Sequence, residues 1–283
     1  VPNILATGLK LLLPRTRVVL GVRSSNVDLS RYDWLTRVAY AVECRLARFA
    51  DLIIANSHAG KRHAAASGFP EGKIIVIPNG IETKIFFFDP EGRRRVRAAW
   101  GLSVDAILVG LVGRLDPMKD HPNFINAASC ISRKRHEVQF VCVGSGPAAY
   151  AEALKRQAAT LGLTDQLIWA GAHDDMPAVY SALDIVVSSS LFGEGFSNTI
   201  AEAMACGVPC VATDVGDSAL IVGETANVVA PGDHSSLAMA IQQMADLDHE
   251  ERRNLGAACR IRVVSEFGIE RLLQRSEQAI GLV

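Results

Sequence analysis

The stretch that most constrains the fold of this chain is residues 192–216, which read FGEGFSNTIAEAMACGVPCVATDVG. Two glycines flank Glu194 and predict a loop whose backbone can approach a ligand closely. Ser197 or Asn198 then caps a predicted helix, and Cys210-Val211-Ala212 reads as a short buried strand. This loop–helix–strand order is typical of an α/β fold. Backbone N–H groups at such a helix start favour an anion, for example a phosphate.

Composition bounds the class of protein. With 283 residues, the chain can bury one large core or two modest ones. Its apolar fraction of 49% and charged fraction of 21% are ordinary for a globular protein, and a net charge of −1 gives no electrostatic reason to expect nucleic acid as a partner. The six cysteines lack zinc-site spacing, so we expect reduced, mostly buried thiols and a cytoplasmic protein. No run of eighteen apolar residues predicts a membrane span, and the start at Val1 suggests a processed or truncated product.

The first ninety residues alternate between helical and strand patterns. Predicted helices cover residues 3–13, 32–48 and 59–67, and predicted buried strands cover residues 17–22, 52–55 and 73–77. Alternation of this kind favours a small Rossmann-like parallel sheet.

The same alternation resumes after a connection near residues 86–90. Strands are predicted at residues 106–112, 138–143, 167–170 and 184–188, with helices between them and a last helix at 267–280. We therefore predict an α/β fold with domains at 1–88 and 89–266, and a separate C-terminal helical segment at 267–283. The basic run at 92–97, GRRRVR, reads better as the solvated face of a helix than as a phosphate or membrane contact.

Charged residues cluster around the predicted anion site. Glu194 lies ahead of the helix and Glu202 about one turn inside it. Taken alone, Glu194 reads as a solvated loop acid and Glu202 as an acid that complements the helix dipole. Beside a phosphate, the two carboxylates could instead accept hydrogen bonds from the hydroxyls of a sugar and a ribose. Arg114 and Lys119, five residues apart in a loop that leaves a strand, could converge on two phosphates or lie in an ordinary surface loop.

Together these segments resemble a known family. The stretch at 192–216 and the GR-x4-K pattern at Arg114 and Lys119 resemble the donor-site signature of retaining glycosyltransferases of family 4, which have the two-domain GT-B fold. The segments FADLIIANS and IIVIPNGIET resemble the end of the first domain of that family. The family's opening strand and glycine-rich loop have no counterpart in this sequence, so the resemblance implies an incomplete first domain. It also implies that the C-terminal helix at 267–283 crosses back to the first domain.

The resemblance also implies roles for individual residues. Catalytic roles fall on Glu194, which would hold the transferred hexose, and on Arg114 and Lys119, which would hold the diphosphate. The implied donor-binding residues are Gly195, Phe196, Ser197, Asn198 and Thr199, whose amides would hold the diphosphate, Glu202 for the ribose, Gly144 in a glycine-rich turn, and His173 in the loop that borders the nucleobase.

The implied activity is transfer of a hexose from a UDP- or GDP-sugar, bound between the domains, to a glycan or lipid-linked acceptor with retention of configuration. Two fixed cations can replace a divalent metal, so we expect no metal and no cofactor. The resemblance further suggests contact with the inner face of the cytoplasmic membrane, and an incomplete first domain suggests exposed apolar surface and self-association. Two alternatives stay open. One is a donor-binding fragment without catalysis. The other is a GT-B-like epimerase or phosphorylase, although the sequence signals neither the acid/base groups that an epimerase needs nor the pyridoxal-phosphate lysine of a phosphorylase.

Overall fold

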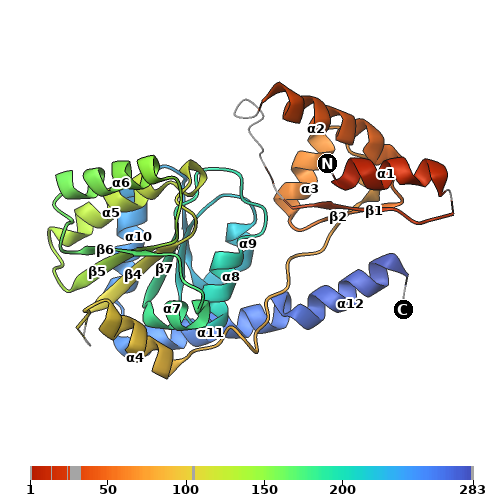
Figure 1. The fold of residues 1–283 in the computed structure, drawn as a ribbon. Coiled ribbons are helices and arrows are strands. Elements are labelled where there is room, and N and C mark those ends of the chain that lie inside the picture. The colour runs from red at the N-terminus through yellow and green to blue at the C-terminus, as the bar shows by residue number, and fades with distance from the viewer. Residues whose placement is uncertain (1, 14, 24, 26–32, 104–105, 282–283) are drawn as a thin grey trace.

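The protein is an α/β structure with two separate sheets of parallel strands (Figure 1). The computed structural model describes residues 2–13, 15–23, 25, 33–103 and 106–281. The predicted fold class, two Rossmann-like bodies with parallel sheets, is thereby confirmed.

The first sheet has the order β1-β2-β3. Its strands are β1 (Val19–Val22), β2 (Leu52–Ala55) and β3 (Ile74–Val76), and its helices are α1 (Pro2–Leu12), α2 (Trp34–Leu46) and α3 (His58–Ala66). The short apolar runs pair in parallel, with Leu20 opposite Ile53 and Ile53 opposite Ile74. These side chains form a small core with residues of the helices, as expected for strands covered on a face by crossover helices. The predicted start of α2 near residue 32 lies outside the described residues.

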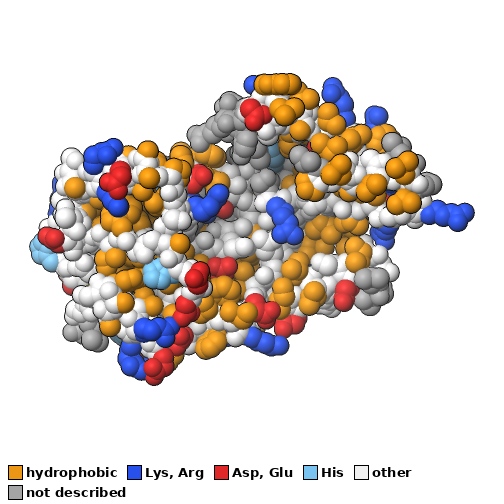
Figure 2. Space-filling view, viewed as in Figure 1, with side chains coloured by type: hydrophobic (Ala, Val, Ile, Leu, Met, Phe, Trp, Pro, Cys, Tyr) orange, Lys and Arg blue, Asp and Glu red, His pale blue; other side chains and the backbone are white. Residues whose placement is uncertain are grey.

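Apolar side chains are exposed on α1 and α2. Leu5 and Leu9 of α1 are 64% and 53% exposed, and Trp34 and Leu35 of α2 are 73% and 63% exposed. Figure 2 shows hydrophobic side chains over this part of the molecule, at its upper right. The expected exposure of apolar helix surface in the first body is therefore present.

The second sheet has six parallel strands in the order β6-β5-β4-β7-β8-β9. The strands are β4 (Ile107–Val112), β5 (Val138–Val143), β6 (Leu167–Gly171), β7 (Ile185–Ser188), β8 (Cys210–Thr213) and β9 (Asn227–Val229). The central strands are continuous apolar runs because both faces of the sheet are buried.

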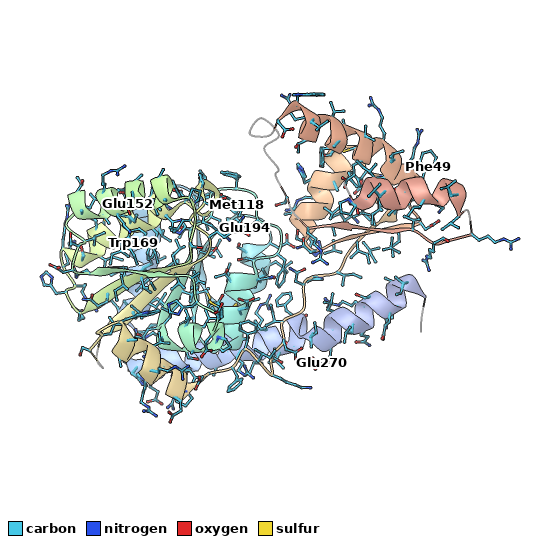
Figure 3. The ribbon with its side chains drawn as sticks, in the orientation of Figure 1. Phe49, Met118, Glu152, Trp169, Glu194 and Glu270 are labelled. Atoms are coloured by element: carbon cyan, nitrogen blue, oxygen red, sulfur yellow. The ribbon has the colours of Figure 1, made fainter. Side chains whose placement is uncertain are left out.

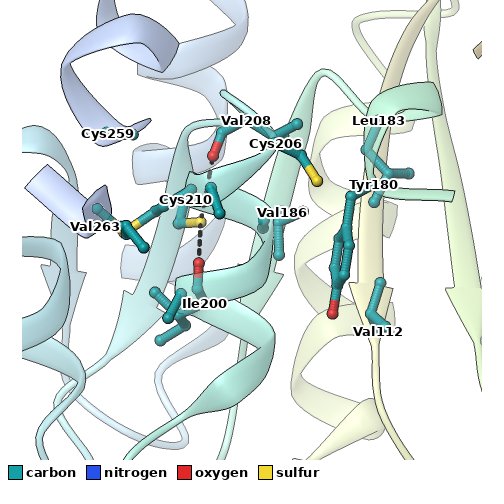
Figure 4. Packing of buried hydrophobic residues seen from close by; sticks show 14 of the residues in the cluster. Val112, Tyr180, Leu183, Val186, Ile200, Cys206, Val208, Cys210, Cys259 and Val263 are labelled. Atoms are coloured by element: carbon teal, nitrogen blue, oxygen red, sulfur yellow. Dashed lines mark hydrogen bonds between the residues drawn. The ribbon is translucent and has the colours of Figure 1, made fainter. Parts of the chain in front are cut away.

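Helices cover both faces of this sheet. They are α4 (Pro90–Ala99), α5 (His121–Ser132), α6 (Ala148–Thr160), α7 (Met176–Ala182), α8 (Asn198–Ala205), α9 (Ser218–Val222), α10 (His234–Asp246) and α11 (His249–Phe267). Alternate strand residues pack against α7, α8 and α11 on one face and against α5, α6 and α10 on the other. In the first of these layers (Figure 4), the Cys210 thiol donates to the carbonyls of Ile200 and Val208.

The cysteines match the expectation of free, mostly buried thiols. All six are free; four are buried, Cys44 is half-buried and Cys130 is exposed. Burial raises the pKa of the Cys206 thiol to about 12, so this thiol stays protonated at neutral pH. Among the described residues, none of the helices combines the length and the apolar character needed to cross a bilayer.

The basic run of α4 is only partly a solvated face. Arg94 and Arg95 are exposed, as predicted. For Arg93 and Arg97 the prediction is wrong, because both guanidinium groups reach into the body and pair with Asp184 at the start of β7 (2.7 and 3.1 Å). These two arginines anchor α4 to the second sheet.

The last helix, α12 (Ile269–Ile280), lies beside the first body (Figure 1). Backbone bonds join Ile81 to Phe267 and Ile269 (2.7 and 3.0 Å), and the Arg17 guanidinium donates to the carbonyl of Ile280 at 2.8 Å. The chain after α11 thus contacts the segment that follows β3, at Ile81, and the segment that precedes β1, at Arg17.

Candidate donor site

The sheet order locates the site. From β4 the chain moves outward to β5 and β6, and then returns to the other side of β4 for β7, β8 and β9. The reversal lies between β4 and β7, and ligands of open α/β sheets bind at the carboxyl ends of the strands at such a point. The loops that leave β4 and β7 carry Lys119 and Glu194, and Figure 3 shows Glu194 and Met118 on the side of the second body that faces the first.

Lys119 and Glu194 form an ion pair in this position. Lys119 Nζ lies 2.5 Å from Glu194 Oε1, and the Ser190 hydroxyl donates to the same oxygen at 2.7 Å. The side chains of Lys119 and Glu194 are 15% and 8% exposed, so this is a largely desolvated pair rather than a surface one. The structure therefore rejects the interpretation of Glu194 as a solvated loop acid.

The loop that carries Lys119 is held in a strained conformation. Asp120 has a φ of +47°, the one positive φ among the described non-glycine residues, and its side chain caps α5. The Ser189 hydroxyl of the β7 loop donates to the carbonyls of Lys119 and Asp120 (2.7 and 3.1 Å). These contacts fix the two loops against each other, and strain of this kind is found at functional sites.

The start of α8 lacks a side-chain cap. Ser197 occupies the cap position but makes no capping bond, and its hydroxyl is buried without any partner in the described structure. The amides of the first turn of α8 therefore have no side-chain acceptor, which suits an anion. Asn198, in contrast, accepts a hydrogen bond from Asn79 of the first body at 2.8 Å.

Glu202 lies in the same helix with one oxygen engaged. The Tyr180 hydroxyl of α7 donates to Glu202 Oε2 at 2.7 Å. Burial raises the pKa of Glu202, although the Tyr180 bond opposes this shift. The second oxygen has no side-chain partner among the described residues, so it can accept from a ligand hydroxyl.

Several predicted residues act through backbone or packing. The Phe196 ring is 6% exposed and packs on Phe267 at 5.3 Å, so only its backbone can face a ligand. A Cβ on Gly195 would lie 2.8 Å from Asn56 Oδ1 of the first body, and one on Gly144 would lie 2.0 Å from the Gly113 carbonyl. The glycine requirement at 144 thus comes from the protein's own β4 loop rather than from a passing ligand.

In the described structure, no ion pair or side-chain hydrogen bond joins the other predicted residues to the Lys119–Glu194 pair. Arg114 is exposed and has no ion pair or side-chain hydrogen bond in the described structure. His173 is half-buried with its ring edge-on to Trp100 at 5.7 Å. Thr199 is half-buried in the first turn of α8. Within the described ranges, no three His, Cys, Asp or Glu side chains are grouped so that they could hold a metal ion.

Two family models match the chain. The model described as Glycosyltransferase Family 4 matches residues 2–85, and the one described as Glycosyl transferases group 1 matches residues 106–246. The chain belongs to the group 1, or family 4, glycosyltransferases.

Curated relatives of this family 4 chain include sugar transferases. The lipopolysaccharide core biosynthesis mannosyltransferase LpsB of Rhizobium meliloti is 34% identical over 220 residues, which cover 75% of this chain and 59% of LpsB. A GDP-mannose-dependent alpha-(1-6)-phosphatidylinositol monomannoside mannosyltransferase of Mycolicibacterium smegmatis is 30% identical, covering 74% of this chain and 56% of that protein. The chain thus spans between half and three fifths of the length of these relatives.

Solved structures share the fold. Anabaena Alr3699/HepE in complex with UDP has a TM-score of 0.88 at 23% identity, covering 99% of this chain and 76% of HepE. Sucrose-phosphate synthase from Thermosynechococcus elongatus has a TM-score of 0.82 at 26% identity, covering 99% of this chain and 72% of that one. Both support the GT-B arrangement for this family 4 glycosyltransferase.

Sequence reasoning missed the residues that connect the two bodies. Asp217, 5% exposed, accepts hydrogen bonds from the amides of His58 and Ala59 at the start of α3 (2.6 and 2.9 Å). Ser25 donates its hydroxyl to the carbonyl of Glu194. Asp217 directly follows the 192–216 stretch, but its partners are more than 150 residues away, so no local pattern could reveal them.

His121 begins α5 and is a buried neutral base. It is fully buried, and neither ring nitrogen has a partner in the described structure. Burial lowers the pKa of His121 to about 4, with the positive charge of Lys119 adding to the effect.

This environment predicts acid destabilisation. Because the folded pKa of about 4 lies below the unfolded value near 6.5, the unfolded chain binds more protons between these values, and stability falls as the pH drops through them. From pH 7 to pH 5, the wild type should lose about 2 kcal/mol more unfolding free energy than His121→Gln, as measured by urea titration. Equal losses in the two proteins would show that His121 does not titrate in this range.

Proposed function

We propose that this chain carries the donor site of a retaining hexosyltransferase, which moves a hexose from a UDP- or GDP-sugar to a glycan or lipid-linked acceptor. The observation that carries the proposal is the desolvated Lys119–Glu194 pair beside the uncapped start of α8, at the switch point of the second sheet. The names of the relatives, two of them mannosyltransferases, support hexose transfer.

In this proposal the diphosphate lies on the α8 amides. The buried hydroxyl of Ser197 donates to a phosphate oxygen, and Lys119 and Arg114 supply positive charge. As the bond between the anomeric carbon and the diphosphate breaks, negative charge grows on the leaving group, and fixed cations and amides stabilise it without reorganisation. Two cations perform here the electrostatic role of a metal, so the reaction needs no metal.

Glu194 lies on the sugar side of the diphosphate. Its carboxylate supports positive charge at the anomeric carbon, and its loop holds the hexose hydroxyls. The acceptor hydroxyl adds to the face that the diphosphate leaves, which retains the configuration, and its proton departs with the diphosphate. The free oxygen of Glu202 accepts from the ribose, and the His173 loop borders the base.

The cellular setting is also a proposal. Free cysteines favour the cytoplasm, and the exposed apolar side chains of α1 and α2 suit contact with the inner face of the membrane, or self-association.

Calorimetry with UDP and GDP tests the donor site. At least one nucleotide should bind equally with and without millimolar EDTA. Arg114→Ala should weaken nucleotide binding about tenfold while leaving the nucleoside unaffected, and Glu202→Ala should weaken both, because ribose is common to both ligands. Arg133→Ala, an exposed arginine at the end of α5, is the matched control. The proposal is contradicted if neither UDP nor GDP binds, or if EDTA abolishes the binding.

A further inference from the structure

A cavity of about 520 Å³ lies in the second body, at the edge of the sheet opposite the proposed donor site. Leu183 and Asp184 precede β7, Val208 and Pro209 precede β8, and these residues line the cavity at the amino ends of the two strands. The donor site lies at the carboxyl ends, and a four-residue strand such as β7 spans roughly 13 Å. A ligand in the cavity would therefore lie outside the donor site, and the volume is within the range of small-molecule sites.

Much of the cavity wall is apolar. Phe88, from the connection between the two bodies, is 50% exposed and lines the cavity together with Leu183, Val208, Pro209 and Ala257. Figure 1 shows α4 and α11, the helices on either side, at the lower edge of the second body. Apolar surface of this kind favours the apolar part of a ligand.

Helix α11 adds a basic face to this apolar wall. The residues of α11 in the lining recur at the spacing that places side chains on one face of a helix: His249, Arg252, Arg253, Ala257 and Arg260. The acids of the same first turn, Glu250 and Glu251, are absent from the lining. The helix therefore presents cations to the cavity and keeps its acids elsewhere.

The cavity has an excess of positive charge. Arg93 joins the three arginines of α11, and Asp184 is the one acid among the described residues of the lining. Asp184 is already paired with Arg93 and Arg97 (2.7 and 3.1 Å). Within the part of the chain that the structure describes, no acid forms an ion pair with Arg252, Arg253 or Arg260.

Two of these guanidinium groups are held in place by the protein. Arg252 donates through Nη1 to the carbonyls of Met244 and Leu247 at the end of α10, both at 3.0 Å. Arg260 donates to the Phe86 carbonyl at 2.9 Å. Capping of this kind explains both arginines as parts of the fold, but it does not explain Arg253, whose side chain has no partner among the described residues. The Arg253 guanidinium and the remaining nitrogens of Arg252 are available to an anion.

We propose that this cavity binds a phosphate monoester with an apolar body, whose phosphate accepts hydrogen bonds from Arg252 and Arg253. Guanidinium forks match phosphate oxygens, and three α11 cations favour a dianion over a carboxylate. The apolar body covers Phe88 and the aliphatic wall beside it. Because the sheet separates this cavity from the donor site, the ligand is an effector rather than a substrate.

Calorimetry on the full chain with octyl phosphate tests the site. Inorganic phosphate has the charge without the chain, and octanol has the chain without the charge, so both should bind about tenfold more weakly. Octanoate, which carries a single charge, should have an intermediate affinity. Saturating UDP or GDP should leave the affinity for octyl phosphate unchanged, because the two sites lie at opposite edges of the sheet.

Two substitutions locate the binding. Arg253→Gln removes a charge that no described contact uses, and Ala257→Trp fills the cavity from an exposed helix position; each should weaken octyl phosphate about tenfold. The matched controls are Arg133→Gln, at an exposed arginine of the same body, and Ala258→Trp, at the exposed neighbour that is absent from the lining. Both controls should bind as the wild type does.

Four results would overturn the effector site: no binding of octyl phosphate, binding that survives both cavity substitutions, equal affinity for octanol or inorganic phosphate, or competition by UDP or GDP. The nucleotide titrations report separately on the donor site. If neither nucleotide binds while octyl phosphate still depends on Arg253 and Ala257, the donor-site proposal fails and the effector site stands.

Discussion

Lys119→Met is expected to destabilise the second body by about 3–5 kcal/mol, because it leaves Glu194 buried without its counter-charge. Methionine keeps the length of the aliphatic chain, so the loss reports on charge rather than on packing. Ser190 would still donate to Glu194, but a neutral hydroxyl replaces little of the ammonium's contribution. Urea unfolding at pH 7 measures the effect.

The double variant Lys119→Met/Glu194→Gln measures the interaction energy between the two charges, apart from their contacts with other groups. Removing both charges removes the uncompensated carboxylate, so the double variant should be at least 2 kcal/mol more stable than the sum of the single effects predicts. The control is Lys134→Met, because Lys134 is an exposed lysine of the second body whose side chain has no partner among the described residues. This substitution should change stability by less than about 0.5 kcal/mol. Additive single effects would show that the pair is not coupled in solution.

The pair also refines the roles inferred from sequence. Lys119 was expected to hold the diphosphate and Glu194 the hexose, as separate contacts. In the structure, each is the partner of the other, so a diphosphate must share Lys119 with Glu194 or displace Glu194 from it. Glu194→Gln should therefore bind UDP or GDP as well as the wild type or better, since Lys119 is released.

The fold was predictable because local patterns determine it. Short apolar runs such as β4 and β7, separated by helices, indicate a buried parallel sheet, and polar loops at their carboxyl ends indicate the binding edge. The sequence HDDMP at residues 173–177 reads as a loop, but α7 already begins at Met176. In fact, Pro177 occupies the first turn of the helix, where a proline costs no hydrogen bond.

The site was predictable in its residues but not in its contacts. Glu194 and Lys119 are 75 residues apart, and no spacing rule joins them. Tyr180, which holds Glu202, reads in sequence as an ordinary core aromatic of a helix, and Phe196 reads as part of a ligand loop although its ring belongs to the core. In each case the decisive fact is a side-chain direction that depends on tertiary packing.

Asp217→Ala is expected to weaken the junction of the two bodies by a free energy similar in size to the destabilisation expected for Lys119→Met. Its carboxylate receives two amide hydrogen bonds from α3 while 5% exposed, and charge-assisted bonds of this kind contribute about 1.5–3 kcal/mol each. The N-terminal end of α3 also attracts a negative charge. Ser57 caps only the Gly60 amide, so the His58 and Ala59 amides would lose their acceptor.

Hydrogen exchange measures this loss where it occurs. A cost of about 3 kcal/mol corresponds to roughly a hundredfold faster exchange of the His58 and Ala59 amides in Asp217→Ala. Asp217→Asn, which keeps one carbonyl acceptor but no charge, should give an intermediate rate. Ser57→Ala should affect mainly the Gly60 amide, by about 1 kcal/mol, and leave the junction closed. Unchanged exchange at His58 and Ala59 in Asp217→Ala would mean that the contact does not hold the bodies together.

The same residue links this junction to the donor loop, because the Asp217 amide donates to the carbonyl of Gly195 at 3.0 Å. A ligand that orders the Glu194–Gly195 loop should therefore order Asp217 and, through its carboxylate, the start of α3. Saturating UDP or GDP should slow exchange at His58 and Ala59 in the wild type but not in Asp217→Ala, where the connection between loop and helix is cut. Slowing of equal size in both proteins would show that the nucleotide acts on α3 by another route.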